Sequence, residues 1–216
     1  MRIRIKFCGI TSAEDRDSAI SAGADAIGLV FFKDSARFVS QKKADEIARD
    51  MPPFVSIVGV FVNEDMRFVE DCVERYNLGA VQLHGDEDTK YCLGFKGLNF
   101  KGVSLIKAIR VSNRESLDCL EDCPADAFLL DTYKSGAYGG TGRGFDRSLA
   151  VLAAEYGRRL IISGGLNPNN VYEIIKEIKP YGVDVSSGIE SSPGNKNIEL
   201  MEQFVEEVRR AESDLA

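Results

Sequence analysis

Residues that can take up or release a proton stand at the ends of several short apolar runs. Cys8 closes a run that begins near Ile3, His84 closes one that begins near Ala80, and Asp131 closes one that begins near Ala127. A thiol, an imidazole and a carboxyl group are the side chains that most often serve as general acids and bases. The chain therefore holds the parts of a proton-transfer site, provided that the fold brings these run ends together.

Two glycine-rich stretches in the second half of the chain are suited to binding an anion. Ser163-Gly164-Gly165-Leu166 follows one apolar run, and Ser186-Ser187-Gly188-Ile189-Glu190 follows the next. Glycine lets backbone N–H groups approach a phosphate closely. A third stretch, residues 139–144, places Arg143 among four glycines, and we expect it to be a lid over a bound substrate or else a plain surface loop.

The elements that must position these residues alternate regularly between strand and helix. Eight β-rich runs begin near Ile3, Ala26, Ser56, Ala80, Ser104, Ala127, Leu160 and Val183. Helical stripes such as Val69, Cys72, Val73 and Tyr76 lie between them, and each strand-plus-helix unit takes about 26 residues. This pattern predicts a single α/β domain over residues 1–216, a closed (β/α)₈ TIM barrel with eight parallel strands. An open doubly wound sheet is the alternative, but no GxGxxG turn follows the first run.

Strand parity predicts which side chains face the inside of such a barrel. Helices cover the outside, so the apolar positions of each strand face outward and the alternate positions face inward. On this basis Lys6 and Asp184 face inward from the first and eighth strands, which are neighbours in a closed barrel. Because a buried charge needs a partner, we predict an ion pair between Lys6 and Asp184.

Composition limits the compartment and the partners. The chain has 216 residues and a formal net charge of −7, so it lacks the basic footprint of a nucleic-acid-binding protein. It has no apolar stretch of the roughly 20 residues that a membrane-spanning helix needs. The five cysteines are an odd number, and the first residues alternate like a strand, so we expect free thiols in the cytoplasm. Cys119 and Cys123 have no second ligand pair, and we expect no metal site.

The ordered motifs resemble those of the phosphoribosylanthranilate isomerase family. The resemblance covers nearly the whole chain, and its main motifs are Lys6-Phe7-Cys8-Gly9-Ile10-Thr11, Ser35-Ala36-Arg37-Phe38-Val39, Val81-Gln82-Leu83-His84-Gly85, Leu130-Asp131-Thr132, Ser163-Gly164-Gly165-Leu166-Asn167-Pro168 and Val183-Asp184-Val185-Ser186-Ser187-Gly188-Ile189-Glu190. Any one of these motifs is weak evidence. The complete set, in order and with the right spacing, is specific.

The resemblance implies an Amadori rearrangement in tryptophan biosynthesis, in which N-(5-phosphoribosyl)anthranilate becomes 1-(2-carboxyphenylamino)-1-deoxyribulose 5-phosphate. It implies that Asp131 is the general acid and Cys8 the general base, without a metal or an organic cofactor. We expect the cation Lys6 to lower the pKa of Cys8. By the same resemblance Arg37 meets the anthranilate carboxylate and His84 lines the pocket. The expected phosphate-binding residues are Gly164, Gly165, Ser186, Ser187 and Gly188.

Two positions depart from the family pattern, and several alternatives stay open. Arg147 stands where many members have Trp, and Asn197 stands where Asp is common, which weakens the inference of a helix cap there. Another phosphosugar barrel enzyme, or a barrel that only binds a phosphorylated ligand, is the alternative function. The sequence leaves open whether the chain is a monomer or a homodimer.

Overall fold

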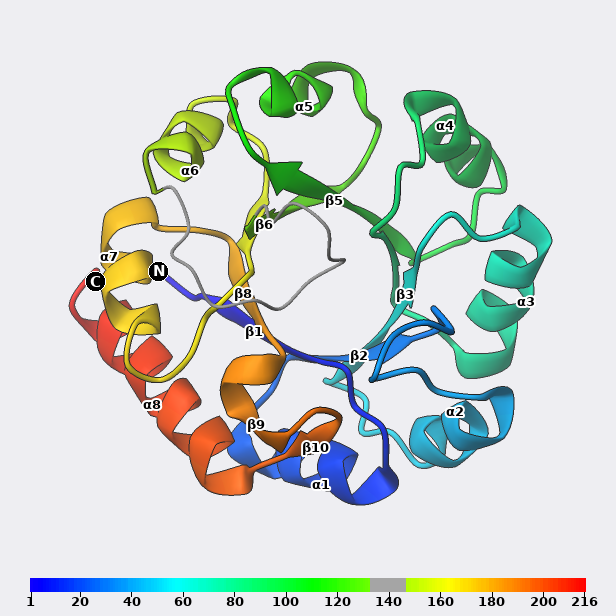
Figure 1. Ribbon diagram of the computed structural model, residues 1–216, viewed down its shortest axis with the longest axis horizontal. Coiled ribbons are helices and arrows are strands. Elements are labelled where there is room, and N and C mark those ends of the chain that lie inside the picture. Colours follow the sequence, from blue (N-terminus) through cyan, green and yellow to red (C-terminus); the bar gives the residue numbers. More distant parts are fainter. Residues whose placement is uncertain (133–146) are drawn as a thin grey trace.

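The computed structural model describes residues 1–132 and 147–216, and these form a closed barrel of parallel strands ringed by helices (Figure 1). Each strand pairs with the next, and β8 pairs with β1 to close the ring. The barrel strands are β1 (Arg4–Cys8), β2 (Ala26–Val30), β3 (Ser56–Phe61), β4 (Ala80–Leu83), β5 (Ser104–Val111), β6 (Ala127–Thr132), β7 (Leu160–Ile162) and β8 (Gly182–Val185). The predicted (β/α)₈ barrel is confirmed.

Helices follow the strands on the outside of the barrel. They are α1 (Ala13–Ala22), α2 (Gln41–Ala48), α3 (Met66–Tyr76), α4 (Thr89–Gly97), α5 (Cys119–Asp122), α6 (Arg147–Ala154), α7 (Val171–Ile178) and α8 (Ile198–Ser213). The short 3₁₀ helix η1 (Glu115–Leu117) precedes α5. The C-terminal α8 packs against both α7 and α1, so the last helix completes the outer ring (Figure 1).

A small addition interrupts the regular alternation after β8. The 3₁₀ helix η2 (Ser187–Ile189) leads into β9 (Glu190–Ser192), which pairs antiparallel with β10 (Asn195–Lys196). Asn197 then caps α8, because its side-chain oxygen accepts a hydrogen bond from the Leu200 N–H at 3.0 Å. The departure from Asp to Asn at this position therefore keeps the cap.

The apolar core has two shells, as strand parity predicts. The outer shell lies between strands and helices and includes Ile5, Phe7, Phe128 and Leu130. The inner shell fills the barrel, and its members are Val58, Ala80, Ile106, Ala108, Ala127, Leu129 and Ile161. Polar side chains nearer the carboxyl ends of the strands therefore lie above a layer of buried apolar side chains.

Candidate active site

A cavity of about 310 Å³ opens at the carboxyl ends of the strands, where a barrel enzyme has its site. Eight of the nine predicted site residues line it, and these are Cys8, Arg37, His84, Asp131, Gly164, Gly165, Ser186 and Ser187. Cys8 and Asp131 come from β1 and β6, which β7 and β8 separate in the closed ring of strands (Figure 1). The fold therefore brings the thiol and the carboxyl group to one cavity.

The ninth predicted residue, Gly188, lies in η2 and is not among the lining residues of this cavity. A Cβ atom built at Gly188 would stand 1.9 Å from the carbonyl oxygen of Leu166. Gly188 thus allows the backbone after β8 to approach the backbone after β7. The two glycine-rich loops meet because this position has no side chain.

Lys6 and Asp184 form the predicted ion pair at the base of the cavity. The two residues are register partners on β1 and β8, and Lys6 Nζ lies 2.8 Å from Asp184 Oδ1. Ser163 donates a further hydrogen bond to Asp184 Oδ2 at 3.2 Å. Burial disfavours the Lys6 ammonium, but the Asp184 carboxylate outweighs this and raises the pKa of Lys6.

The environment of Cys8 is different from the one expected. Burial raises the pKa of the Cys8 thiol above its ordinary value, although Lys6 and Lys196 act in the opposite direction. Lys6 cannot offset the burial because its charge is already paired with Asp184, whose carboxylate itself raises the pKa of Cys8. The expectation of a lowered Cys8 pKa is therefore wrong.

Asp131 is held by a short chain of polar contacts. His84 Nε2 lies 3.1 Å from Asp131 Oδ2, and His84 Nδ1 lies 2.9 Å from Gln82 Nε2. Asp131 is 6% exposed and Gln82 is fully buried. The single histidine of the chain thus contacts the candidate acid directly.

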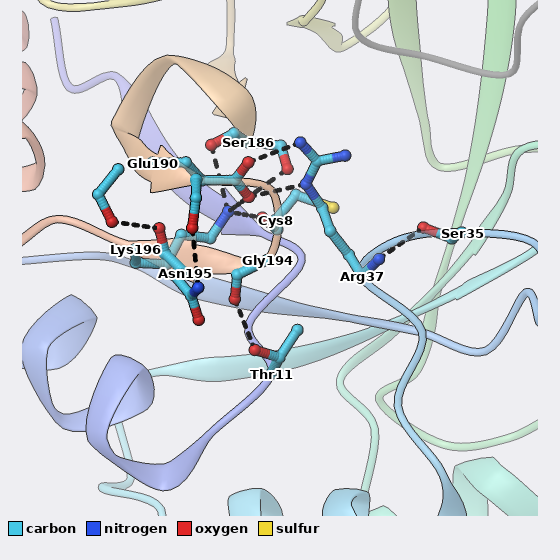
Figure 2. A network of polar contacts seen from close by, with 11 residues as sticks. Cys8, Thr11, Ser35, Arg37, Ser186, Glu190, Gly194, Asn195 and Lys196 are labelled. Atoms are coloured by element: carbon cyan, nitrogen blue, oxygen red, sulfur yellow. Dashed lines mark hydrogen bonds and ion pairs between the residues drawn. The ribbon is translucent and has the colours of Figure 1, made fainter.

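Arg37 reaches the cavity as part of a buried ionic network (Figure 2). Its Nε and Nη2 donate to the two carboxylate oxygens of Glu190 at 2.7 and 2.6 Å. Lys196 Nζ donates to Glu190 Oε1 at 2.8 Å, to the Cys8 carbonyl at 2.7 Å and to the Ser186 carbonyl at 3.2 Å. This network ties the ends of β1 and β8 to the loop after β2.

The charges of this network shift the pKa values of its members. Burial alone would raise the pKa of Glu190, but Arg37 and Lys196 outweigh it and lower that pKa. Burial lowers the pKa of Lys196, and the Glu190 carboxylate opposes this only in part. Glu190 is therefore held as a carboxylate.

Sequence reasoning gave no role to Glu190 or Lys196. Glu190 was visible only as the last residue of a motif, and Lys196 stands in the polar segment before α8. A charged residue directly after the apolar Ile189 is a weak signal of a buried acid. Nothing local pairs it with Arg37, which is 153 residues away in the chain.

The remaining expectations concern the lid, the cysteines, a metal site and a membrane span. The predicted lid, residues 139–144, lies outside the described residues, as does the side chain of Arg147. All five cysteines are free, and among residues 1–132 and 147–216 no group of three or more potential metal ligands gathers. No helix in those same ranges is long and apolar enough to cross a membrane.

Comparison with known proteins agrees with this geometry. A family model described as N-(5'phosphoribosyl)anthranilate (PRA) isomerase matches residues 5–207. The chain belongs to the phosphoribosylanthranilate isomerase family. An N-(5'-phosphoribosyl)anthranilate isomerase from Trichlorobacter lovleyi is 43% identical over 209 residues, which cover 97% of this chain and 99% of the relative. The resemblance inferred from the motifs is confirmed.

Solved structures of phosphoribosylanthranilate isomerases share the fold. That of the Thermotoga maritima enzyme has a TM-score of 0.87 at 38% identity, covering 97% of this chain and all of that chain. A second structure, with a TM-score of 0.84 at the same identity and coverage, is a phosphoribosylanthranilate isomerase in complex with reduced 1-(o-carboxyphenylamino)-1-deoxyribulose 5-phosphate. A third, with a TM-score of 0.84 at 36% identity and the same coverage, contains monomers generated from the dimeric Thermotoga maritima enzyme.

Proposed function

We propose that the protein isomerises N-(5-phosphoribosyl)anthranilate to 1-(2-carboxyphenylamino)-1-deoxyribulose 5-phosphate in tryptophan biosynthesis. The observation that carries this proposal is the placement of Cys8 and Asp131 in one cavity at the carboxyl ends of the strands. Family membership supports the same reaction. The substrate carries a carboxylate and a phosphate, and the cavity offers a separate partner for each.

Asp131 is proposed as the general acid that opens the sugar ring. It gives a proton to the furanose ring oxygen, the C1′–O bond breaks, and the anilino nitrogen supplies the electron pair of the resulting iminium. An acid held beside His84 on a buried strand end cannot move away from the ring oxygen. General acid catalysis of this kind contributes roughly 10²–10⁴ to a rate.

Cys8 is proposed as the general base of the second step. As a thiolate it removes the proton from C2′, and the electron pair of that C–H bond moves toward the iminium to give an enolamine. Protonation at C1′ together with loss of the proton of the 2′-hydroxyl group then yields the ketone. Two protons are added, at the ring oxygen and C1′, and two are removed, from C2′ and the 2′-hydroxyl, so the reaction is a net isomerisation. Gly28 on β2 leaves room for the sulfur, because a Cβ atom there would stand 2.9 Å from Cys8 Sγ.

Arg37 is proposed to bind the substrate carboxylate although Glu190 already occupies one edge of its guanidinium. A guanidinium has a second bidentate edge formed by Nη1 and Nη2, and Arg37 lines the cavity.

We assign the phosphate to the loops after β7 and β8. Gly164 and Gly165 have φ angles of 82° and 72°, a left-handed backbone that favours glycine. The proposed role of His84 is to hold Asp131 by the contact between Nε2 and Oδ2, and not to bind the substrate.

The experiment that tests the proposal is a fluorescence assay with freshly made phosphoribosylanthranilate. The wild type should consume the fluorescent substrate. Cys8→Ala and Asp131→Asn should each lose about 10²–10⁴ in kcat, with circular dichroism to confirm that both variants fold. Absence of turnover by the wild type would favour the alternative of a barrel that only binds its ligand.

We also propose that the protein works in the cytoplasm and forms a homodimer. Its ligand is the small phosphorylated substrate, and it does not bind nucleic acid. Five free cysteines support a reducing compartment, and the net charge of −7 is unfavourable for nucleic acid. For the dimer, Phe54 is 94% exposed beside a cavity of about 490 Å³ at the amino ends of the strands. An exposed large apolar side chain next to such a cavity suits a second copy of the chain.

A further inference from the structure

Gln82 is a buried polar side chain that the proposed reaction does not use. It lies on β4, is 0% exposed, and its Nε2 faces His84 Nδ1 at 2.9 Å. Within the described residues its Oε1 meets no hydrogen-bond partner. A buried amide with an unsatisfied carbonyl costs free energy, so its presence on a barrel strand needs an explanation.

The contact between Gln82 and His84 decides which ring nitrogen carries the proton. An amide N–H can only donate, so Nδ1 must accept, and the neutral ring then has its hydrogen on Nε2. That hydrogen points to Asp131 Oδ2, 3.1 Å away. In the other tautomer Nδ1–H would confront the amide N–H, and Nε2 would accept a hydrogen from Asp131.

The two tautomers place the acidic proton of Asp131 on different oxygens. When His84 Nε2–H donates to Oδ2, a proton on Asp131 must sit on Oδ1, the oxygen that His84 leaves free for the substrate. The same hydrogen bond then stabilises the carboxylate as the proton departs. When Nε2 accepts instead, the proton sits on Oδ2 and is turned toward the ring of His84.

We propose that Gln82 is a positioning residue that holds His84 in the Nε2–H tautomer and thereby directs the proton of Asp131 to the substrate. The orphaned Oε1 is the consequence of turning the amide nitrogen toward the ring. This inference rests on the proposed role of Asp131 as general acid. Asp131 is the acidic member of this chain of contacts, and Arg110 is its register partner on β5.

The chain has a single histidine, so nitrogen NMR reads its tautomer without overlap. We expect the wild type, labelled with ¹⁵N-histidine at a pH where the ring is neutral, to show an unprotonated Nδ1 and a protonated Nε2. In Gln82→Met the donor is lost, and the signals of the two nitrogens should move toward each other as both tautomers are populated. A wild type with a protonated Nδ1, or a Gln82→Met spectrum identical to the wild type, overturns the proposal.

Kinetics supply the second measurement. We expect Gln82→Met to lower kcat about tenfold, the effect of about one hydrogen bond to a charge that forms in the transition state, with KM changed less than twofold. The control is Ile106→Val, which alters an apolar register partner of Gln82 on β5 and should change neither the tautomer nor kcat. A shifted tautomer with unchanged kcat also overturns the proposal. Full activity of Asp131→Asn would instead overturn the proposed general acid and leave the tautomer result standing.

Discussion

Cys8 shows how one residue is tuned by opposing neighbours. Burial raises the pKa of its thiol, and the nearby cations cannot compensate because Asp184 pairs with Lys6 and Glu190 pairs with Lys196. A base with a raised pKa is mostly protonated at neutral pH. At neutral pH a larger fraction of Cys8 is therefore protonated than of an ordinary cysteine side chain.

This pairing leads to a pH prediction. Because only the thiolate accepts the C2′ proton, kcat/KM of the wild type should keep rising in alkali beyond the ordinary pKa of a thiol, since the pKa of Cys8 is raised. Cys8→Asp supplies a carboxylate base with a much lower ordinary pKa, so its alkaline rise should disappear. Stopped assays of kcat/KM against pH measure both. The same alkaline rise in Cys8→Asp would remove Cys8 as its origin.

Sequence reasoning at the residue scale succeeded where the information was local to a strand. The Lys6–Asp184 pair followed from parity along two strands that a closed barrel must make neighbours. The Arg37–Glu190–Lys196 network did not follow, because it joins the loop after β2 to β9 and β10, whose position depends on η2 and on the β9–β10 hairpin. No periodic pattern in the sequence predicts that hairpin.

Glu190 gives a second prediction at this scale. Its side chain is 4% exposed between two cations, so Glu190→Gln leaves both without a counter-charge and should lower the free energy of unfolding by about 3 kcal/mol at neutral pH. The folded pKa of Glu190 is below its ordinary value. Its stabilisation is therefore complete above the ordinary pKa and is lost as the pH falls through the lowered one.

Urea unfolding at a series of pH values measures this difference. The gap between wild type and Glu190→Gln should shrink in acid. Asp45→Asn is the control, because it breaks an exposed ion pair with Arg75 and should have only a small effect at any pH. A gap that stays constant down to pH 3 would contradict the assigned coupling.

At the scale of elements, strands were predicted more accurately than helices. Six of the eight predicted strand starts coincide with observed ones, and Ile3 and Val183 differ from Arg4 and Gly182 by one residue. Strands buried on both sides are short, dense apolar runs with sharp limits. Helices give a less regular signal: the segments near Ala19, Tyr91 and Leu117 carry only a weak apolar stripe, and α1 buries only Ala19.

Gly188 determines how closely η2 approaches the loop after β7. In Gly188→Ala the new methyl group would collide with the Leu166 carbonyl, so the two loops must separate. We expect KM to rise about tenfold, through loss of the proposed phosphate contacts, and stability to fall by about 1–3 kcal/mol. Gly97→Ala is the control, since a Cβ atom at the end of α4 meets nothing within 4 Å. Equal KM values for the two variants would contradict this account of Gly188.

At the scale of the whole molecule, the net charge of −7 and an anionic substrate need reconciling. From the sequence, Arg37, Lys6 and the backbone amides of the glycine-rich loops are the groups that could make the mouth receptive to a carboxylate and a phosphate. Both side chains are paired with carboxylates, Lys6 with Asp184 and Arg37 with Glu190. Glu190 is also the partner of Lys196, so Arg37 and Lys196 share one carboxylate. The attraction therefore comes from this pair of cations and from the backbone amides of the glycine-rich loops.

The cavity at the amino ends of the strands suits an interface between two copies of the chain. Phe54 stands exposed at the rim of the cavity between the amino ends of the strands, and two-fold symmetry would let each copy place Phe54 in the cavity of the other. Wild type should elute as a dimer in light-scattering chromatography, whereas Phe54→Asp should be a monomer, because it removes the aromatic ring that would fill the cavity of the partner. Its kcat should be retained, since Phe54 lies at the mouth opposite Cys8 and Asp131. Leu93→Asp, on the exposed face of α4, should remain a dimer, and a dimeric Phe54→Asp protein would exclude this face as the interface.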